Sequence, residues 1–392
     1  MDTAKRVNHS IRTLERLLEA YRQAAGTPLA RFLTTFYRQH RQMGARDRRL
    51  VSRLAYHYFR LGHAARQSVL SERLAMAEFL CSEESDIVQH LLPNLYPAIR
   101  VPLDEKIMLL EAQSGFRLDD VFPLADRLSG GIDRRAFVRS LFVQPDLFIR
   151  LRPGKADTVV AALEAAGIPI HRLDEQTAAL PNGTRLDQVP GIDGCYEVQD
   201  YSSQRVGHFF QALPGEHWWD ACAGSGGKSL LMLDQTPGVK LLVSDVRDHI
   251  LQNLDTRFRR AGFRDYQRLH IDLTAPVAPL LGDRMFDGII LDVPCSGSGT
   301  WGRTPEMITV TGAADIARFA ALQRQVAAAV VPHLKPGKPL IYITCSVFAQ
   351  ENEQVVADLQ DRFPLRVDRI ALLAGYPDRA DSLFVARLIR TA

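Results

Sequence analysis

Two cysteines, Cys295 and Cys345, are the residues of this 392-residue chain whose type and placement best fit catalysis. Cys295 lies in LDVPCSGSGTWGRTPE, at 291–306, after an apolar run typical of a buried strand. Cys345 lies 50 residues later, in YITCS, after the apolar residues 340–343. Ligands of open α/β sheets bind at the carboxyl ends of the strands, so we expect both cysteines to face one crevice. A thiolate there suits covalent catalysis, whereas a buried cysteine is usually an inert hydrophobe.

The glycine-rich stretch DACAGSGGKS, at 220–229, is a second candidate site, because it leads from an expected strand into a helix. Glycines let the backbone approach a ligand, and free amides at a helix start favour negative charge. The stretch fits neither GxxxxGK[ST], since Cys222 stands where glycine is needed, nor GxGxxG. A nucleoside-type ligand remains, with Asp245 at the next strand end as an acceptor for ribose hydroxyls. On these residues alone an NAD enzyme stays possible.

The remaining candidates each have two interpretations. Asp272 could contact an adenine or only stabilise a turn, and Lys228 could face the ligand or be a helix-surface charge. We expect Cys81 and Cys195 to be inert core residues, and Cys222 to contact the ligand through its backbone. Because no CxxC pair or nearby histidine supplies ligand spacing, we expect no metal site.

The elements that must position these residues divide the chain into three predicted domains. Residues 1–130 show helical periodicity without a convincing strand and predict an all-α domain. Residues 131–200 predict a small α+β connector. Residues 201–392 alternate apolar strands with helices, which is typical of a Rossmann-like, doubly wound α/β domain.

Within the last two domains the individual elements follow from apolar runs and turn residues. In the connector we expect a helix at 155–166 and strands at 147–151, 168–173 and 184–189, the last preceded by a Pro-Asn-Gly turn. In the α/β domain we expect strands at 241–243, 286–291, 340–343 and 382–388, and helices at 228–233, 247–261, 313–331 and 350–361.

Charge is distributed unevenly along the chain, whose formal net charge is +3. Residues 1–66 contain 14 lysines and arginines against four aspartates and glutamates. This excess favours a polyanion as partner, although a solvated helical surface is the alternative. The same two alternatives apply to Arg257, Arg259, Arg260, Arg264 and Arg268, and the connector could contact RNA or only link its neighbours.

Cysteine usage and hydropathy indicate the compartment. Five scattered cysteines do not resemble a disulfide framework, and no apolar run approaches the length needed to span a membrane. The amino terminus is charged and amphipathic, so we expect no cleaved signal. We therefore expect a reduced, cytoplasmic protein without a membrane partner, and a monomer.

Three stretches, taken in order, resemble the Sun (RsmB-like) family of RNA 5-methylcytosine methyltransferases, which use S-adenosylmethionine. Residues 220–229 are similar to its first motif, DxCAAPGGKT, and residues 292–306 to its fourth, DAPCSGxGxxRRxPD. Residues 344–356, TCSVFAQENEQVV, are similar to its sixth, TCSxxxxENExVV. The resemblance covers roughly 198–392, and residues 45–62 are more loosely similar to the NusB-like domain of the ribosomal RNA members.

The chain departs from the family pattern at three places. Gly224-Ser225 replaces Ala-Pro in the first motif, and Trp301-Gly302 replaces arginine or a variable residue in the fourth. Residues 150–152 read RLR where the family tends to read RVN. These departures leave the expected chemistry in place but put the particular RNA target in doubt.

The resemblance implies a role for each candidate residue. Carbon 5 of cytosine is a poor nucleophile, so a thiolate must first add to carbon 6, and the resemblance assigns this step to Cys345. It implicates Cys295 in the later release of the product and places Asp292 against the cytosine ring nitrogen. Lys228 would lie over the methionine end of the cofactor. The implied cofactor-binding residues are Cys222, Ala223, Gly224, Ser225, Gly226, Gly227, Lys228, Asp245, Asp272 and Asp292.

The resemblance makes RNA the expected partner, with ribosomal RNA ahead of tRNA as substrate. The alternative from another class is a non-catalytic RNA-binding factor in ribosome assembly, against which the intact Cys345, Cys295 and Asp292 argue. A DNA cytosine-5 methyltransferase would take its nucleophile from the proline-cysteine loop of the fourth motif. The TCS sequence around Cys345 argues against that enzyme.

Overall fold

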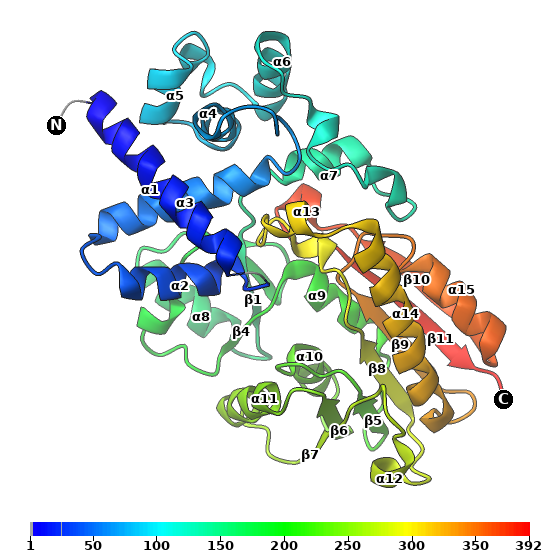
Figure 1. Cartoon of the computed structure of the whole chain (residues 1–392). Coiled ribbons are helices and arrows are strands. Elements are labelled where there is room, and N and C mark those ends of the chain that lie inside the picture. The colour runs from blue at the N-terminus through cyan, green and yellow to red at the C-terminus, as the bar shows by residue number, and fades with distance from the viewer. Residues whose placement is uncertain (1–2, 25) are drawn as a thin grey trace. The chain divides into compact units, whose positions relative to one another are not determined.

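The computed structural model describes residues 3–24 and 26–392, which form two compact units, drawn together in Figure 1. The helical unit takes its residues from Met1–Asp126, Asp133–Gln144 and Trp301–Thr311. The sheet unit comprises Arg127–Ile132, Pro145–Thr300 and Gly312–Ala392.

The helical unit confirms the predicted all-α start of the chain. Val7, Ile11, Leu14 and Leu18 all lie on the buried face of its first helix, as their spacing predicts. The α-helices of this unit are α1 (Thr3–Gln23), α2 (Leu29–Gln39), α3 (Ala45–Arg60), α4 (Leu70–Cys81), α5 (Asp86–Leu91), α6 (Leu103–Gln113), α7 (Arg134–Ser140) and α13 (Met307–Val310).

The segment Trp301–Thr311 is distant in sequence from the rest of the helical unit, yet it contributes to that unit's core. Trp301 is 1% exposed, and its ring packs edge-on against Phe122 with centroids 5.7 Å apart. The buried Glu306 accepts a hydrogen bond of 3.0 Å from the backbone N–H of Leu29, at the start of α2. A carboxylate at this end of a helix satisfies one of its unpaired N–H groups and complements the helix dipole.

The connector predicted at 131–200 contains a four-stranded antiparallel sheet, and one of the predicted strands is wrong. Residues 184–189 contain a 3-10 turn at Leu186–Gln188, and Thr177–Leu180 forms the strand instead. The Pro-Asn-Gly turn, with φ +83° at Gly183, therefore ends a strand and does not begin one. The sheet order is β2-β3-β1-β4, with β1 (Leu147–Leu151), α8 (Ala156–Ala165), β2 (His171–Arg172), β3 (Thr177–Leu180) and β4 (Tyr196–Val198).

The predicted Rossmann-like doubly wound domain is confirmed by a seven-stranded sheet of order β10-β11-β9-β8-β5-β6-β7. The strands from β5 to β9 pair in parallel, and β10 and β11 add an antiparallel edge. Their bounds are β5 (His217–Asp220), β6 (Lys240–Asp245), β7 (Gln267–His270), β8 (Gly288–Asp292), β9 (Pro339–Thr344), β10 (Leu365–Leu373) and β11 (Leu383–Arg390).

Helices cover both faces of this sheet, because alternate strand residues point to opposite sides. Trp218 packs with residues of α10 and α11, whereas its neighbour Trp219 packs with residues of α14. Figure 1 shows α14 and α15 beside β9 and β11, away from α10 and α11. The helices of this unit after the connector are α9 (Tyr201–Arg205), α10 (Gly227–Gln235), α11 (Asp248–Arg260), α12 (Ala278–Leu281), α14 (Ala313–Val330) and α15 (Glu353–Arg362).

The order of the strands creates one topological switch point beside β5, which pairs with β6 on one side and with β8 on the other. The chain winds outward in opposite directions from this position, so the loops after β5 and β8 separate. A crevice between such loops is the position in which open α/β sheets bind ligands. The glycine-rich stretch comes after β5, and the Cys295 loop comes after β8.

Candidate active site

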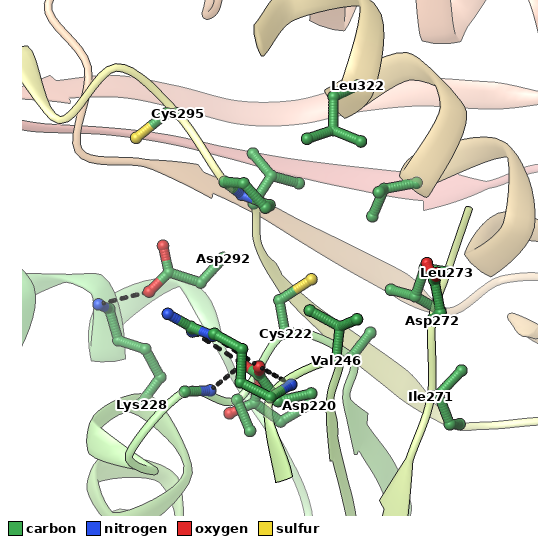
Figure 2. A pocket seen from close by; sticks show the side chains of 18 of the residues that line it. Asp220, Cys222, Lys228, Val246, Ile271, Asp272, Leu273, Asp292, Cys295 and Leu322 are labelled. Atoms are coloured by element: carbon green, nitrogen blue, oxygen red, sulfur yellow. Dashed lines mark hydrogen bonds and ion pairs between the residues drawn. The ribbon is translucent and has the colours of Figure 1, made fainter. Parts of the chain in front are cut away.

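A cavity of about 760 Å³ opens beyond the carboxyl ends of the parallel strands and brings the predicted site residues together. Gly226 alone among them does not line it. The predicted residues that do are Cys222, Ala223, Gly224, Ser225, Gly227, Lys228, Asp245, Asp272, Asp292, Cys295 and Cys345. In Figure 2, Asp292 and Cys295 lie on one side of the cavity and Ile271, Asp272 and Leu273 on the other.

The glycine-rich loop is held in shape by its own backbone and by the helix behind it. Gly226 has φ +81° and begins α10 from a left-handed conformation. A Cβ at this position would lie 2.5 Å from the ring of Phe258 and 3.0 Å from Leu254. Gly226 therefore sets the path of the loop by close packing, and the residues on either side of it face the cavity.

Asp245 is 5% exposed and accepts hydrogen bonds from within the chain. Its carboxylate accepts hydrogen bonds from the Gly224 N–H at 3.0 Å and from Arg247, whose Nε lies 2.9 Å away. Burial opposes ionisation, but the bonds from Arg247 and Gly224 outweigh it and hold the pKa of Asp245 below its usual value. Asp245 is thus an ionised acceptor, and its partner is the half-exposed guanidinium of Arg247.

Lys228 and Asp292 form an ion pair on one side of the cavity, with Nζ and Oδ2 3.0 Å apart (Figure 2). Burial disfavours the ammonium, yet attraction to Asp292, and also to Cys345 and Asp220, raises the pKa of Lys228. Lys228 is therefore a fixed positive charge at the site.

The two predicted cysteines meet, with their sulfur atoms 3.2 Å apart. The Gly299 N–H, in the loop after Cys295, donates to the Cys345 carbonyl at 2.8 Å and holds the two loops together. The hydrogen bond to Cys345, together with burial and the charge of Glu351, raises the pKa of Cys295 well above its ordinary value. These surroundings favour the protonated form of Cys295.

The other cysteines lack this environment. Burial raises the pKa of Cys81 to about 12, and Cys81 belongs to the helical unit. Burial and the neighbouring acids, Asp220 first among them, raise the pKa of Cys222 well above its ordinary value, although Cys222 lines the cavity. Neither thiol is suited to act as a nucleophile.

Asp272 forms the turn that one interpretation of its position predicts. Its carboxylate accepts hydrogen bonds from the N–H and the hydroxyl of Thr274, at 2.9 and 2.6 Å, as in an Asx-turn. The same residue lines the cavity. Turn formation therefore accounts for one carboxylate oxygen and leaves the other available to a ligand.

Sequence reasoning missed Asp220, Val246 and Arg247, which also line the cavity. Asp220 is 1% exposed; Ser229 donates to its Oδ2 at 2.6 Å, and its Oδ1 has no hydrogen-bond partner in the described chain. Burial raises the pKa of Asp220 to about 7. Its position as the first residue of the glycine-rich stretch was a signal that could have identified it.

Neither a membrane-spanning helix nor a metal cluster occurs among residues 3–24 and 26–392. None of the helices in these ranges combines the length and apolar character needed to cross a membrane. None of the histidine, cysteine, aspartate and glutamate side chains in these ranges gather in a group of three or more that could hold a metal ion.

Residues 209–374 match the family described as 16S rRNA methyltransferase RsmB/F. This part of the chain is therefore similar to the RsmB/F methyltransferases. The ribosomal RNA small subunit methyltransferase B of Salmonella heidelberg is 33% identical over 228 residues, which cover 54% of this chain and 52% of that protein. The protein of the same name from an Enterobacter species is 30% identical over 272 residues, covering 65% and 62%. The chain thus matches between half and two thirds of the length of these relatives.

Two solved structures share the fold at low sequence identity. PH0851 superposes with a TM-score of 0.70 and 20% identity, over 90% of this chain and 92% of its own. NSun6 from Pyrococcus horikoshii, solved with SFG, gives a TM-score of 0.60 at 14% identity, over 69% of this chain and 97% of its own.

The departures from the RsmB/F motifs have local structural explanations. Arg150 and Arg152 both form ion pairs with Asp234 of α10, at 2.6 and 2.8 Å, and so attach the connector sheet to the helix that begins at the glycine-rich loop. Ser225, which replaces proline, accepts a hydrogen bond of 3.2 Å from Arg257.

Three of the five arginines singled out along α11 and β7 are engaged in ion pairs. Arg257 pairs with Glu197, Arg260 with Asp193 and Arg268 with Asp255. These contacts favour a structural role for them over RNA contact.

We expect Asp220→Asn to stabilise the protein increasingly as pH rises. The folded chain keeps a proton on Asp220 up to about pH 7, whereas the unfolded chain releases it near pH 4. The free energy of unfolding of the wild-type protein therefore falls as pH rises between these values. The asparagine does not titrate. At 1.36 kcal/mol per pKa unit, the difference between the two proteins should grow by on the order of 2–4 kcal/mol and level off above pH 7. Thermal unfolding across a pH series measures it.

Asp287→Asn is the matched control, because burial is outweighed there by hydrogen bonds from Lys335 and His217 that hold the pKa of Asp287 below its usual value. Its effect should have the opposite sign and appear as pH rises through about 4. A constant difference between Asp220→Asn and the wild type from pH 4 to 8 would contradict the assignment.

Proposed function

We propose that this protein transfers a methyl group from S-adenosylmethionine to carbon 5 of a cytosine in ribosomal RNA. The observation that carries the proposal is the pair of sulfur atoms 3.2 Å apart at one cavity, beside Asp292 and the glycine-rich loop. The match of residues 209–374 to the RsmB/F family and the names of the bacterial relatives support methylation of ribosomal RNA.

The chemistry of the cavity suits S-adenosylmethionine. Asp245 offers an ionised carboxylate for ribose hydroxyls, and Asp272 a carboxylate for the adenine side. Asp220 Oδ1, buried without a partner in the described chain, suits a cationic amino group. When bound, the cofactor supplies an electrophilic methyl group.

The residues of the chain act on the cytosine in sequence. The thiolate of Cys345 adds to carbon 6, and the electron pair of the ring double bond moves to carbon 5, which then takes the methyl group. We place Asp292 at the ring nitrogen, where its carboxyl group must carry a proton in order to donate a hydrogen bond and offset the negative charge that develops there. The carbon 5 proton leaves to Cys295, which must have released its own proton to solvent by this stage, and the returning electron pair restores the double bond and expels the Cys345 thiolate.

The environment of the two thiols supports this division of roles. Lys228 interacts electrostatically with Cys345, so a positive charge lies near the nucleophile that we propose. Cys295 has a raised pKa and keeps its proton next to Cys345. A protonated thiol is poorly suited to begin the reaction as a nucleophile.

Asp245→Ala should weaken S-adenosylmethionine binding by about 1–3 kcal/mol, because it removes hydrogen bonds to a charged acceptor. Isothermal titration calorimetry with the cofactor measures the change. Asp248→Ala is the control, since Asp248 is a nearby acid of α11 outside the cavity lining. Equal affinity of Asp245→Ala and wild type would remove Asp245 from the binding site.

Replacing each cysteine by alanine should produce different defects. Cys345→Ala cannot form the adduct, so methylation and protein–RNA crosslinking should both disappear. Cys295→Ala should still add to the base and methylate it, but elimination should slow, leaving RNA covalently attached to the protein. A denaturing gel after incubation with ribosomal RNA and cofactor shows the complex.

The reverse pattern, with RNA trapped by Cys345→Ala and not by Cys295→Ala, would make Cys295 the nucleophile. Transfer of tritium from labelled S-adenosylmethionine to ribosomal RNA, tRNA and DNA separates the candidate substrates in the same experiment. No transfer to any of them would favour the non-catalytic assembly factor.

Arg46 and Arg49 of α3 are exposed charges of the basic helical unit, and replacing both by glutamine should weaken RNA binding without affecting cofactor affinity. For each arginine that neutralises a phosphate, its replacement should reduce the magnitude of the negative slope of log K against log salt by about 0.7–0.9. Filter binding over a salt series measures this slope. Arg22→Gln is the control, because Arg22 is paired with Glu19. An unchanged slope would place the RNA surface elsewhere.

Substitution tests this surface more cleanly than truncation does. Removing residues 1–125 would also uncover Trp301 and Ile308, which are buried among the residues of the helical unit.

A further inference from the structure

Glu351 has no exposed surface, and its carboxylate accepts four hydrogen bonds. Oε1 accepts from the Ser296 N–H at 2.8 Å and from Gln323 Nε2 at 3.1 Å. Oε2 accepts from the hydroxyls of Ser296 and Ser346, both at 2.5 Å. Ser296 directly follows Cys295, and Ser346 directly follows Cys345. One carboxylate therefore joins the two cysteine loops.

The neighbours of Glu351 hold the other side of each cysteine. Gln323 also donates to the carbonyl of Pro294, at 2.9 Å, so Cys295 is fixed through the residue before it as well as the residue after it. On the other loop, Asn352 accepts from the Thr344 hydroxyl at 2.6 Å and donates to the Ser346 carbonyl at 2.9 Å. Both thiols thus project from backbone that is held on two sides.

We propose that Glu351 is a positioning residue that fixes the distance between the thiols of Cys295 and Cys345. The inference rests on the proposed function for its catalytic consequence, but the geometry it concerns is independent of any substrate. Glu351 touches neither sulfur in the contacts described, and it acts through Ser296 and Ser346.

The loops need such a clamp because the sheet stops holding them at the strand ends. The β8–β9 pairing ends at Asp292 and Ile343, and beyond it the backbone offers the bonds from Val293 N–H to Ile343 O and from Gly299 N–H to Cys345 O. A carboxylate is the side chain that can receive several donors at once, since both oxygens accept and neither donates.

The charge of Glu351 and its geometry can be separated by substitution. In Glu351→Gln the amide oxygen can still accept from the Ser296 N–H and Gln323, while the amide NH₂ donates to serine hydroxyls, which also accept. The clamp is retained and the charge is removed. Glu351→Ala removes both and leaves buried donors unpaired, so the two loops should separate.

The test uses phenylarsine oxide, which bridges two close thiols with release of water and without change of oxidation state at sulfur. Intact mass spectrometry of the full chain measures the bridge, and Cys295→Ala and Cys345→Ala, which cannot form it, assign it to this pair. We expect bridging in Glu351→Gln within about threefold of the wild-type rate, and at least about tenfold slower bridging in Glu351→Ala. Ser346→Ala, which removes one donor only, should be intermediate and serves if Glu351→Ala fails to fold.

Glu78→Ala is the matched control, because Glu78 is equally buried and its partners Arg53, His57 and Ser85 all belong to the helical unit. Its bridging rate should equal that of the wild type even though its stability falls. Methylation gives the second measurement: kcat should fall at least about tenfold in Glu351→Ala, recover in Glu351→Gln, and leave the dissociation constant of S-adenosylmethionine within about twofold.

Wild-type bridging in Glu351→Ala, or in Ser346→Ala where the alanine variant does not fold, overturns the positioning role. Slow turnover of Glu351→Gln together with normal bridging also overturns it, since the charge and not the geometry would then matter. Bridging that occurs in the expected order in a protein that methylates no RNA would sink the proposed function alone.

Discussion

Three carboxylates lie almost fully buried near the carboxyl ends of the parallel strands: Asp220 and Asp245 are the last residues of β5 and β6, and Glu351 follows β9. An uncompensated buried charge costs several kcal/mol, so each must be paired, hydrogen-bonded or protonated. Asp245 is compensated by Arg247 and Gly224, and Glu351 by four donors. Asp220 has one hydroxyl partner and a pKa of about 7. The charge of each acid in the site therefore depends on how many hydrogen bonds and ion pairs the chain itself gives to its carboxylate.

The residues that the sequence could predict are those whose position depends on one local rule. Parallel strands place the loops at their carboxyl ends along one edge of the sheet, so Cys295, Cys345, Asp245 and the glycine-rich loop could be assigned to one crevice before the fold was known. Glu351 could not be assigned in this way, although it stands in the sixth motif. Its hydrogen-bond partners lie in two loops and a helix, at 5 to 55 residues from Glu351 in the sequence.

The fold prediction failed in the connector, where the strand lies before the Pro-Asn-Gly turn and not after it. Thr177–Leu180 reads TAAL, which has little β-branched character, and all four residues are buried because they pair with β1. The tertiary pairing overrides a weak intrinsic preference. The neighbouring Pro-Asn-Gly turn was correctly identified, but a turn marks the boundary of a strand without telling which side the strand lies on.

The fourth motif is continuous in sequence but contributes to both compact units, so its two halves meet different structural requirements. Residues up to Thr300 belong to the sheet unit, where Gly299 approaches the Cys345 carbonyl so closely that a Cβ would lie 3.0 Å from it. From Trp301 the chain belongs to the helical unit, where Trp301 fills its core and Glu306 caps α2. The second half of the motif, from Trp301 onward, therefore packs the helical unit and does not belong to the catalytic loop. The tryptophan that departs from the family pattern lies in this half.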